Sequence, residues 1–563
     1  MNILPEWLRG YRKPMLPGDM VAGAIVTVML IPQSLAYALL AGLPPQMGLY
    51  ASILPIVAYA WLGSSMTLAV GPVAVASLMT ASALQPLAAA GSPEYVALAM
   101  LLALLSGAML LAFGALRLGF LAHFLSHPVI SGFISGSAIL IAVGQLKHLQ
   151  GVKTGGAHAL DSLVQLARAV PSTNLTTLAL GAGSVLFLWA ARRFLAGWLV
   201  RAGLGSKSAD LIAKLAPMLA VVVSTALVGW LRLDASAGVS VVGAVPLGLP
   251  PMGVPALDMG AVSQLWLPAL LISLVGFVES VSVAQSLALK RRQRIQPNNE
   301  LLGLGAANVA SALSGGFPVT GGFARSVVNF AAGANTPLAG VIAAALMAVV
   351  LAGFTGLFHY LPHAVLAATI IVAVVSLIDL QTLRDACRCD KADALALLAT
   401  AAGVVGFGVE AGILLGVGLS LGTLVWRSSH PHIAVIGRVP GTEHFRNVTR
   451  HAVQTQPGLV ALRVDESLFF ANAGALQDTV EAQMAQQPAA RHVLLVFSAV
   501  NQVDVTALGV LTELEHSLGQ RGVELLLAEV KGPVWDRLRS TTLGQRMAGR
   551  VFLSTKDAYD SVG

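Results

Sequence analysis

The longest uncharged stretch of this chain runs from Met20 to Pro93 and contains no Asp, Glu, Lys or Arg. A second stretch, from Ser326 to Leu383, contains only Asp379. A soluble protein has about 25% charged residues, whereas this chain has 11% and is 56% hydrophobic. A transmembrane helix takes about 20 residues. The first stretch therefore predicts about three helices, and the second predicts two to three. The chain is therefore predicted to be a polytopic α-helical membrane protein.

Basic residues are unevenly distributed along the chain. The first 431 residues contain 22 Lys and Arg against 14 Asp and Glu, and the remainder contains 12 against 13. Three basic connections, at 192–214, 290–294 and 384–391, are assigned to the cytoplasm together with the N-terminus by the positive-inside rule. Lys147 and Lys153 do not fit this assignment. No basic run is interleaved with aromatic residues, so no nucleic-acid partner is predicted.

The segment Gly315–Ser326 interrupts an apolar region with four glycines, a proline and Arg325. A buried arginine costs about 3 kcal/mol in a membrane by insertion scales. Broken backbone is tolerated there only where it is buried in protein or lines a cavity. A short helix beginning beside Arg325 would direct a positive dipole end and a cation at one spot, which favours an anion site. The alternative is a surface loop whose arginine reaches the headgroups.

A second interrupted segment, Val70–Ala76, contains Gly71-Pro72. It is the third predicted crossing of a first half that begins near residue 19, and Gly321-Gly322 lies in the third crossing of a second half that begins near 262. Counting both broken segments gives about fourteen crossings, seven per half. Because each half has an odd number of crossings, the second half has the opposite orientation in the membrane, and the repeats are inverted. Matched breaks of this kind predict the substrate site of a transporter.

Two intact spans carry polar residues. The first, 19–42, contains Pro32, and it places Gln33 and Tyr37 on one helix face. These groups favour a cavity, although helix–helix hydrogen bonding is the alternative. The eighth, 262–289, carries Glu279. Two further intact spans are expected to end near Gly63 and Ser314, and the others are expected near 94–116, 124–147, 175–196, 209–231, 337–357, 361–379, 393–407 and 410–427.

The composition becomes that of a soluble protein from about His432. Apolar strands are predicted at 460–464, 492–497 and 523–528, with helices at 473–487 and 506–520 between them. This alternation predicts a small α/β domain. It contains no GxxxxGK[ST] phosphate loop and no cluster of metal ligands, so an ATPase is not predicted.

The chain contains five polar or glycine-rich motifs in a fixed order: Pro32–Ala38, Gly71-Pro72, Glu279–Ser282, Asn299–Asn308 and Gly316–Ser326. Together they resemble the SulP sulfate-permease family, the bacterial relatives of animal anion exchangers and of prestin. The resemblance covers nearly the whole chain, and the C-terminal domain resembles a STAS domain. It implies an anion-transport domain of core and gate at 1–431, built as a 7+7 inverted repeat, and a cytoplasmic STAS domain at 432–563.

The resemblance also implies where the substrate binds. In the family the anion lies between the facing N-termini of two half-helices, which here begin near Val73 and Arg325. Members often have Ser where this chain has Ala324, so backbone N–H groups and Arg325 would contribute more of the binding here. The implied substrate-binding residues are Gln33, Tyr37, Val73, Ala74, Ala324, Arg325 and Ser326.

Glu279 is the implied residue for the coupling ion or proton. Relatives known for sodium-coupled bicarbonate uptake tend to have Asp at this position and Thr four positions on, whereas this chain has Glu279 and Val283. This departure favours proton symport over sodium symport. The predicted activity is proton-coupled sulfate uptake by elevator-like movement of the core. Bicarbonate, dicarboxylates and anion exchange remain open, and neither an enzyme nor a cofactor or metal is predicted.

The resemblance further implies a homodimer embedded in the lipid of a bacterial inner membrane. In STAS domains of sigma regulators, the phosphorylated Ser or Thr follows an Asp at a helix start. The matching residues are Asp504 and Thr506, although Asp504 also suits a purely structural N-cap. A membrane-anchored STAS regulator is thus the alternative of another class. Truncation after about residue 432 would distinguish it from a transporter.

Overall fold

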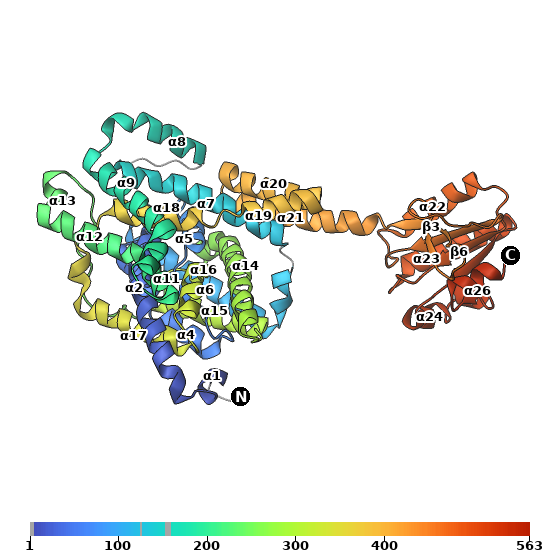
Figure 1. Ribbon diagram of the computed structural model, residues 1–563, viewed down its shortest axis with the longest axis horizontal. Helices are drawn as coiled ribbons and strands as arrows, with labels where there is room; N and C mark the ends of the chain where they lie inside the picture. Colours follow the sequence, from blue (N-terminus) through green and yellow to red (C-terminus); the bar gives the residue numbers. More distant parts are fainter. Residues whose placement is uncertain (1–4, 124–125, 153–158, 563) are drawn as a thin grey trace. The chain divides into compact units, whose positions relative to one another are not determined.

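A computed structural model describes residues 5–123, 126–152 and 159–562 (Figure 1). The chain divides into two compact units, Met1–Ser420 and Leu421–Gly563. The first unit is almost entirely helical, and the second contains a six-stranded sheet. The prediction of a polytopic helical protein with a C-terminal α/β domain is confirmed.

The helical part follows the predicted two halves. In the described residues, seven helical stretches are long and apolar enough to cross a membrane, and shorter apolar helices lie between them. The main elements of the first half are α2 (Leu16–Leu40), α3 (Pro45–Tyr50), α4 (Leu54–Leu62), β1 (Val70–Gly71), α5 (Ala74–Leu84), α6 (Pro93–Ala115), α7 (His127–Gln150), α9 (Leu175–Ala190) and α12 (Ala216–Leu231). The main elements of the second half are α14 (Met259–Lys290), α15 (Pro297–Leu313), β2 (Thr320–Gly321), α16 (Phe323–Ala331), α17 (Leu338–Gly353), α18 (His363–Val375), α20 (Lys391–Phe407) and α21 (Val409–Ser429). Short connecting helices lie between them: α8 (Ala159–Arg168), α10 (Ala196–Arg201), α11 (Ser206–Lys214), α13 (Leu233–Ser236) and α19 (Leu380–Cys389).

Some helix boundaries differ from the prediction. Helix α2 begins at Leu16 rather than near residue 19, because Pro17 suits the first turn of a helix. The span expected at 209–231 is divided into α11 (Ser206–Lys214) and α12, and the break falls just before Pro217, which lies in the first turn of α12. The span expected at 361–379 ends as α18 at Val375.

Close packing between helices uses glycine. Gly107 of α6 and Gly305 of α15 each lie so near the backbone of the other helix that an added Cβ would approach it to within 3.0 Å. Gly132 of α7 likewise faces the carbonyl of Leu397 in α20, at 2.3 Å from an added Cβ. Small residues at helix crossings are typical of membrane proteins, in which packing must replace the hydrophobic effect. Helices of the first half are thus joined directly to helices of the second.

The two broken segments meet in the middle of the helical unit. β1 and β2 pair antiparallel, with Val70 opposite Gly321 and Gly71 opposite Thr320, and all four residues are buried. Pairing satisfies backbone groups that the interrupted helices leave free, as an apolar environment requires. Each strand leads within three residues into a short helix, α5 after β1 and α16 after β2.

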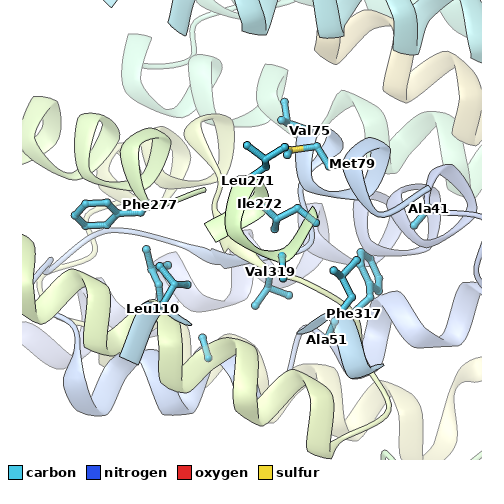
Figure 2. Packing of buried hydrophobic residues seen from close by; sticks show 14 of the residues in the cluster. Ala41, Ala51, Val75, Met79, Leu110, Leu271, Ile272, Phe277, Phe317 and Val319 are labelled. Carbon is cyan, nitrogen blue, oxygen red and sulfur yellow. The ribbon is translucent and has the colours of Figure 1, made fainter. Parts of the chain in front are cut away.

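Apolar and polar contacts hold this strand pair in place. Phe317 and Val319, just before β2, belong to a buried cluster with Met79 of α5 and Ile272 of α14 (Figure 2). The amide of Asn308 in α15 both accepts from the backbone N–H of Val319, at 2.9 Å, and donates to its carbonyl, at 2.8 Å. Two helices from the second half therefore fix the approach to β2.

Glu300 in α15 anchors the chain that leads into β1. Its carboxylate is fully buried and accepts hydrogen bonds from the Tyr59 hydroxyl at 2.7 Å, the Ser64 N–H at 2.8 Å and the Ser65 N–H at 2.9 Å. The Ser64 hydroxyl adds a fourth bond at 2.7 Å. One side chain thus satisfies the donors of a loop more than 230 residues away in the chain.

We expect Glu300→Ala to lower the free energy of unfolding by about 3 kcal/mol or more, because several buried donors would lose their acceptor. Glu94→Ala is the matched control, since Glu94 is exposed in the first turn of α6 and should contribute less than about 1 kcal/mol. Thermal unfolding of the purified full-length protein measures both. Equal, small shifts for the two variants would show that Glu300 does not hold the loop.

The C-terminal unit is an α/β domain with strand order β4-β3-β5-β6-β7-β8. The strands are β3 (Ile433–Arg438), β4 (Phe445–Asn447), β5 (Leu459–Val464), β6 (His492–Val496), β7 (Glu524–Ala528) and β8 (Val551–Phe552). The last four strands are parallel, and β3 is antiparallel to both of its neighbours. The helices are α22 (Ala473–Gln486), α23 (Val505–Gln520), α24 (Gly532–Leu538), α25 (Thr542–Arg546) and α26 (Thr555–Asp560). Three strands and two helices were predicted here, and all five are confirmed.

Candidate functional site

Arg325 lies in the first turn of α16, beside the β1–β2 pair. Its side chain is buried, with 2% exposed, and its Nη1 donates a 2.7 Å hydrogen bond to the carbonyl of Pro72. Nε and Nη2 are also buried but have no hydrogen-bond partner among the described residues. One edge of the guanidinium is therefore fixed to the first broken segment, and the other edge retains two donors in a fork.

Two helix N-termini meet at the same junction. Val73 is the N-cap of α5 and Gly322 is the N-cap of α16, and neither residue supplies a side-chain hydrogen bond to the cap. The first N–H groups of a helix lack intrahelical partners and carry partial positive charge. Uncapped helix starts beside a buried arginine make an electropositive position suited to an anion.

Tyr37 and Glu279 lie close enough to Arg325 for direct electrostatic interaction. Tyr37 of α2 is buried, with 9% exposed. Glu279 of α14 borders a small cavity of about 20 Å³, enough for about one water molecule. The other residues lining the cavity are apolar and come from α7, α14 and α21: Val129, Ile130, Phe133, Ile134, Val275, Val278 and Ile413. The acidic residue therefore borders an apolar cavity between helices and lies within electrostatic range of Arg325.

The remaining candidate residues are placed differently. Gln33 is half-buried in α2, while Val73 and Ala74 are buried at the start of α5. Ala324 is exposed in the first turn of α16. Ser326 is fully buried, and its hydroxyl donates to the Gly322 carbonyl at 2.7 Å and accepts from the Ala69 N–H at 2.9 Å. Because its proton is used inside the fold, the Ser326 hydroxyl acts as a brace between β1 and α16.

Two glycines make room for the guanidinium. An added Cβ would lie 3.0 Å from Arg325 Nη2 at Gly322 and 3.3 Å from the same atom at Gly71. Gly71 also has φ of +152°, a conformation that side chains disfavour. The glycines of both breaks therefore allow the backbone to approach Arg325 closely.

We expect Gly322→Ala to reduce substrate uptake by about tenfold or more, because its methyl group would displace the Arg325 fork. Gly144→Ala is the control, because an added Cβ within α7 meets nothing within 4 Å. Initial uptake rates in proteoliposomes measure the effect, with expression and thermal stability recorded for both variants. A fully active Gly322→Ala protein would show that the position of the guanidinium is not critical.

Several residues that build the site were not identified as such from composition or spacing. The Ser280 hydroxyl pairs with the Thr320 hydroxyl at 2.7 Å and accepts from the Gly321 N–H at 2.9 Å. Asn329 of α16 donates to the Thr67 carbonyl at 3.0 Å. Ser280, Asn308 and Glu300 entered the sequence analysis only as parts of motifs. Their polar character within apolar spans was the available signal, but their partners lie 11 to 241 residues away.

The candidate residues of the C-terminal unit lie at the start of α23. The carboxylate of Asp504 accepts from the Ala507 N–H at 2.8 Å and from the Phe470 N–H at 2.9 Å, so it is an N-cap that also holds a neighbouring loop. Thr506 is exposed beside it. The described residues contain no group of three or more His, Cys, Asp or Glu side chains placed to hold a metal ion.

Comparisons with known proteins agree on the family. The family model described as "Sulfate permease family" matches residues 16–400, and that of the STAS domain matches residues 450–558. A probable sulfate transporter of Mycobacterium tuberculosis is 37% identical over 537 residues, which cover 95% of this chain and 93% of the relative. Sulfate transporter 4.1, chloroplastic, of Arabidopsis thaliana is 35% identical, over 93% of this chain and 76% of that protein.

Solved structures give the same fold. Murine Slc26a9, an anion transporter in the inward-facing state, aligns with a TM-score of 0.88 and 22% identity over 99% of this chain and 93% of that one. The transmembrane domain of the cyanobacterial bicarbonate transporter BicA aligns with a TM-score of 0.61 and 25% identity over 72% of this chain and 99% of that domain. By its sequence matches and its fold, this multi-pass membrane protein belongs to the sulfate permease family and carries a C-terminal STAS domain.

Proposed function

We propose that this protein is a secondary transporter for an oxyanion, with sulfate as the main substrate. The observation that carries the proposal is the pair of buried, unpartnered Arg325 donors beside two uncapped helix starts. Leaving such donors unpaired is costly unless a ligand binds them. Two parallel N–H donors match two oxygens of one anion, which favours an oxyanion over a spherical halide.

Sulfate is preferred for two reasons. Relatives up to 37% identical over most of the chain are named as sulfate transporters. The site also offers a full cation and two helix dipoles, which suit a divalent anion better than a monovalent one. Bicarbonate remains the second candidate because the BicA domain shares the fold, and dicarboxylates present the same pair of oxygens to an arginine.

Glu279 is proposed to carry the coupling proton. Entry of a divalent anion against a negative interior requires compensating positive charge. Glu279 lies near Arg325 and faces apolar side chains of α7 and α21, so a proton would neutralise it while those helices slide past. Val283 replaces the threonine expected in sodium-coupled relatives, which keeps sodium symport as the weaker alternative.

An elevator-type movement fits the way the site is built. β1 and β2 bind α5 and α16 to each other, and Arg325 adds a further bond to Pro72. The two half-helices therefore form one rigid element that can carry an anion as a unit. Polar contacts tie this element to α14 and α15, whereas α7 and α21 present apolar side chains to Glu279.

The proposal includes the setting of the protein. Basic connections favour the cytoplasmic face of a bacterial inner membrane for the N-terminus, and an even number of crossings would bring the STAS domain to the same face. A transport domain at 1–431 and a STAS domain at 432–563 would function within a homodimer surrounded by lipid. The division into compact units falls at 420/421, within α21, which continues to Ser429.

Uptake into proteoliposomes tests the function. Purified full-length protein should accumulate radiolabelled sulfate when the outside is acidic relative to the inside, and excess unlabelled sulfate should compete more strongly than chloride. Parallel assays with bicarbonate, succinate and an inward sodium gradient test the alternatives. Absence of sulfate uptake together with sodium-driven bicarbonate uptake would replace the proposed substrate and coupling ion.

A further inference from the structure

A second group of basic side chains lies at the end of α7, away from the β1–β2 junction. Lys147 and His148 are in the last turn of α7, and His363 is the first residue of α18. The two imidazole rings meet edge to face with their centroids 6.2 Å apart. Lys147 acts electrostatically on His148. A lysine and two imidazoles therefore gather where two helix ends meet.

This corner also contains buried polar atoms without partners. Nε2 of His363, Oε1 of Gln150 and Oγ1 of Thr177 are buried and make no hydrogen bond to any described residue. Thr177 of α9 has 2% of its surface exposed and lies against Gly151, which directly follows α7. The His363 imidazole and the Thr177 hydroxyl can both donate hydrogen bonds to one anion, whereas Oε1 of Gln150 is an acceptor.

The helix between these two ends supplies no negative charge. Helix α9, which packs against both α7 and α18, contains no charged residue between Leu175 and Ala190. Helix α8 (Ala159–Arg168) also packs against α7 and carries Asp161. Among the described residues, no salt bridge joins Asp161 to Lys147. A half-buried lysine without a paired carboxylate favours an external counter-ion.

Stabilisation of the helix dipole does not account for the cluster. Basic residues in a last turn commonly compensate free carbonyl groups. Here the carbonyl of Lys147 already accepts from the Gly151 and Val152 N–H groups, and that of Gln150 accepts from the Asn174 N–H at 2.9 Å. Lys147 also departs from the charge pattern that assigns the other basic connections to the cytoplasm. Lys153, the other exception, lies outside the described residues.

We propose that Lys147, His148 and His363 form a second oxyanion site, separate from Arg325, at the end of α7 opposite the proposed cytoplasmic face. Its ligand is a sulfate or phosphate group, either a free ion or the phosphate of a lipid headgroup. The N-terminus of α18 has no side-chain cap and adds its positive end to the site, with the His363 N–H donating to the Ser240 carbonyl at 3.0 Å. Only the assignment of the membrane face depends on the proposed orientation.

Binding of sodium sulfate to purified full-length Arg325→Ala protein tests the site without the contribution of Arg325. In neutral phosphatidylcholine nanodiscs, calorimetry should detect one sulfate per chain. The double variant His148→Gln/His363→Gln should weaken this binding by about tenfold or more, because each charge-assisted hydrogen bond contributes strongly. His359→Gln is the matched control, since the His359 ring meets the Tyr360 ring edge to face and is not part of the cluster.

Two further experiments identify the source of the anion and show whether a loss of binding results from misfolding. If the natural ligand is a lipid headgroup, anionic phosphatidylglycerol nanodiscs should suppress sulfate binding to the Arg325→Ala protein, and the free-ion source predicts no suppression. Arg325→Gln replaces Arg325→Ala if the latter does not remain monodisperse. The site is disproved if the Arg325 variant binds no sulfate in neutral nanodiscs, or if the double histidine variant binds as tightly as its parent.

Discussion

Replacing Arg325 with Ala should reduce sulfate uptake by at least about a hundredfold while the protein still folds. The change removes two buried donors that the fold leaves free for the substrate, and hydrogen bonds to charged groups contribute about 1.5–3 kcal/mol each. It also removes the cation that attracts a divalent anion to the helix starts. Initial rates of radiolabelled sulfate uptake into proteoliposomes measure the loss, with thermal stability recorded for the same preparation.

Two further variants serve as controls. One distinguishes the effect of the guanidinium's shape from that of its charge, and the other tests whether the loss of any arginine reduces uptake. Arg325→Lys keeps the positive charge but loses the pair of parallel N–H donors. Its uptake rate should therefore lie between the rates of the parent and of the Ala variant. Arg192→Ala removes an exposed arginine that donates to the Val372 carbonyl, and uptake should stay within about twofold of the parent. Full uptake by a stable Arg325→Ala protein would show that the substrate binds elsewhere.

Replacing Glu279 with Gln should abolish the effect of a proton gradient and leave sulfate exchange intact. The amide keeps the size of the side chain but cannot take up or release a proton at the pH of the assay. An inward gradient of about one pH unit supports about tenfold accumulation per coupled proton. The wild-type protein should accumulate sulfate when the outside is more acidic, whereas the variant should only exchange internal for external sulfate. Net uptake and counterflow, measured on the same vesicles, distinguish the two activities.

Glu410→Gln provides the matched control for this experiment. Glu410 is a half-buried carboxylate in the first turn of α21, and it does not line the cavity beside Glu279. Its variant should keep the full response to the gradient. A Glu279→Gln protein that still responds to the gradient would assign the coupling proton to another group, and a response to sodium instead would support the sodium alternative.

The arrangement of helices could be predicted from the sequence because its signals are local. Uncharged stretches, Gly-Pro breaks and strand–helix alternation each depend on neighbouring residues. The matched positions of Gly71-Pro72 and Gly321-Gly322 indicated that the breaks work as a pair. That they hydrogen-bond to each other as β1 and β2 could not be deduced, because the strands are two residues long and 250 residues apart.

The supports of the site could not be predicted for the same reason. Glu300 appears in the sequence as an acidic residue near a helix start, where it would suit the helix dipole. Only the fold brings Tyr59 and Ser64 to it. Ser326 depends on the fold in the same way, because the hydroxyl that the family resemblance implies for the substrate donates to the Gly322 carbonyl and accepts from the Ala69 N–H. Which contacts a polar side chain makes depends on tertiary pairing.

The most direct test of the oxyanion site is a structure of the full-length protein determined with selenate, an analogue of sulfate whose selenium can be located by anomalous scattering. The account predicts one selenate between the starts of α5 and α16, with two of its oxygens about 3 Å from Nε and Nη2 of Arg325. The same experiment on Arg325→Ala should show this position empty. Selenate bound away from the β1–β2 junction, with the Arg325 fork facing no anion, would contradict the account.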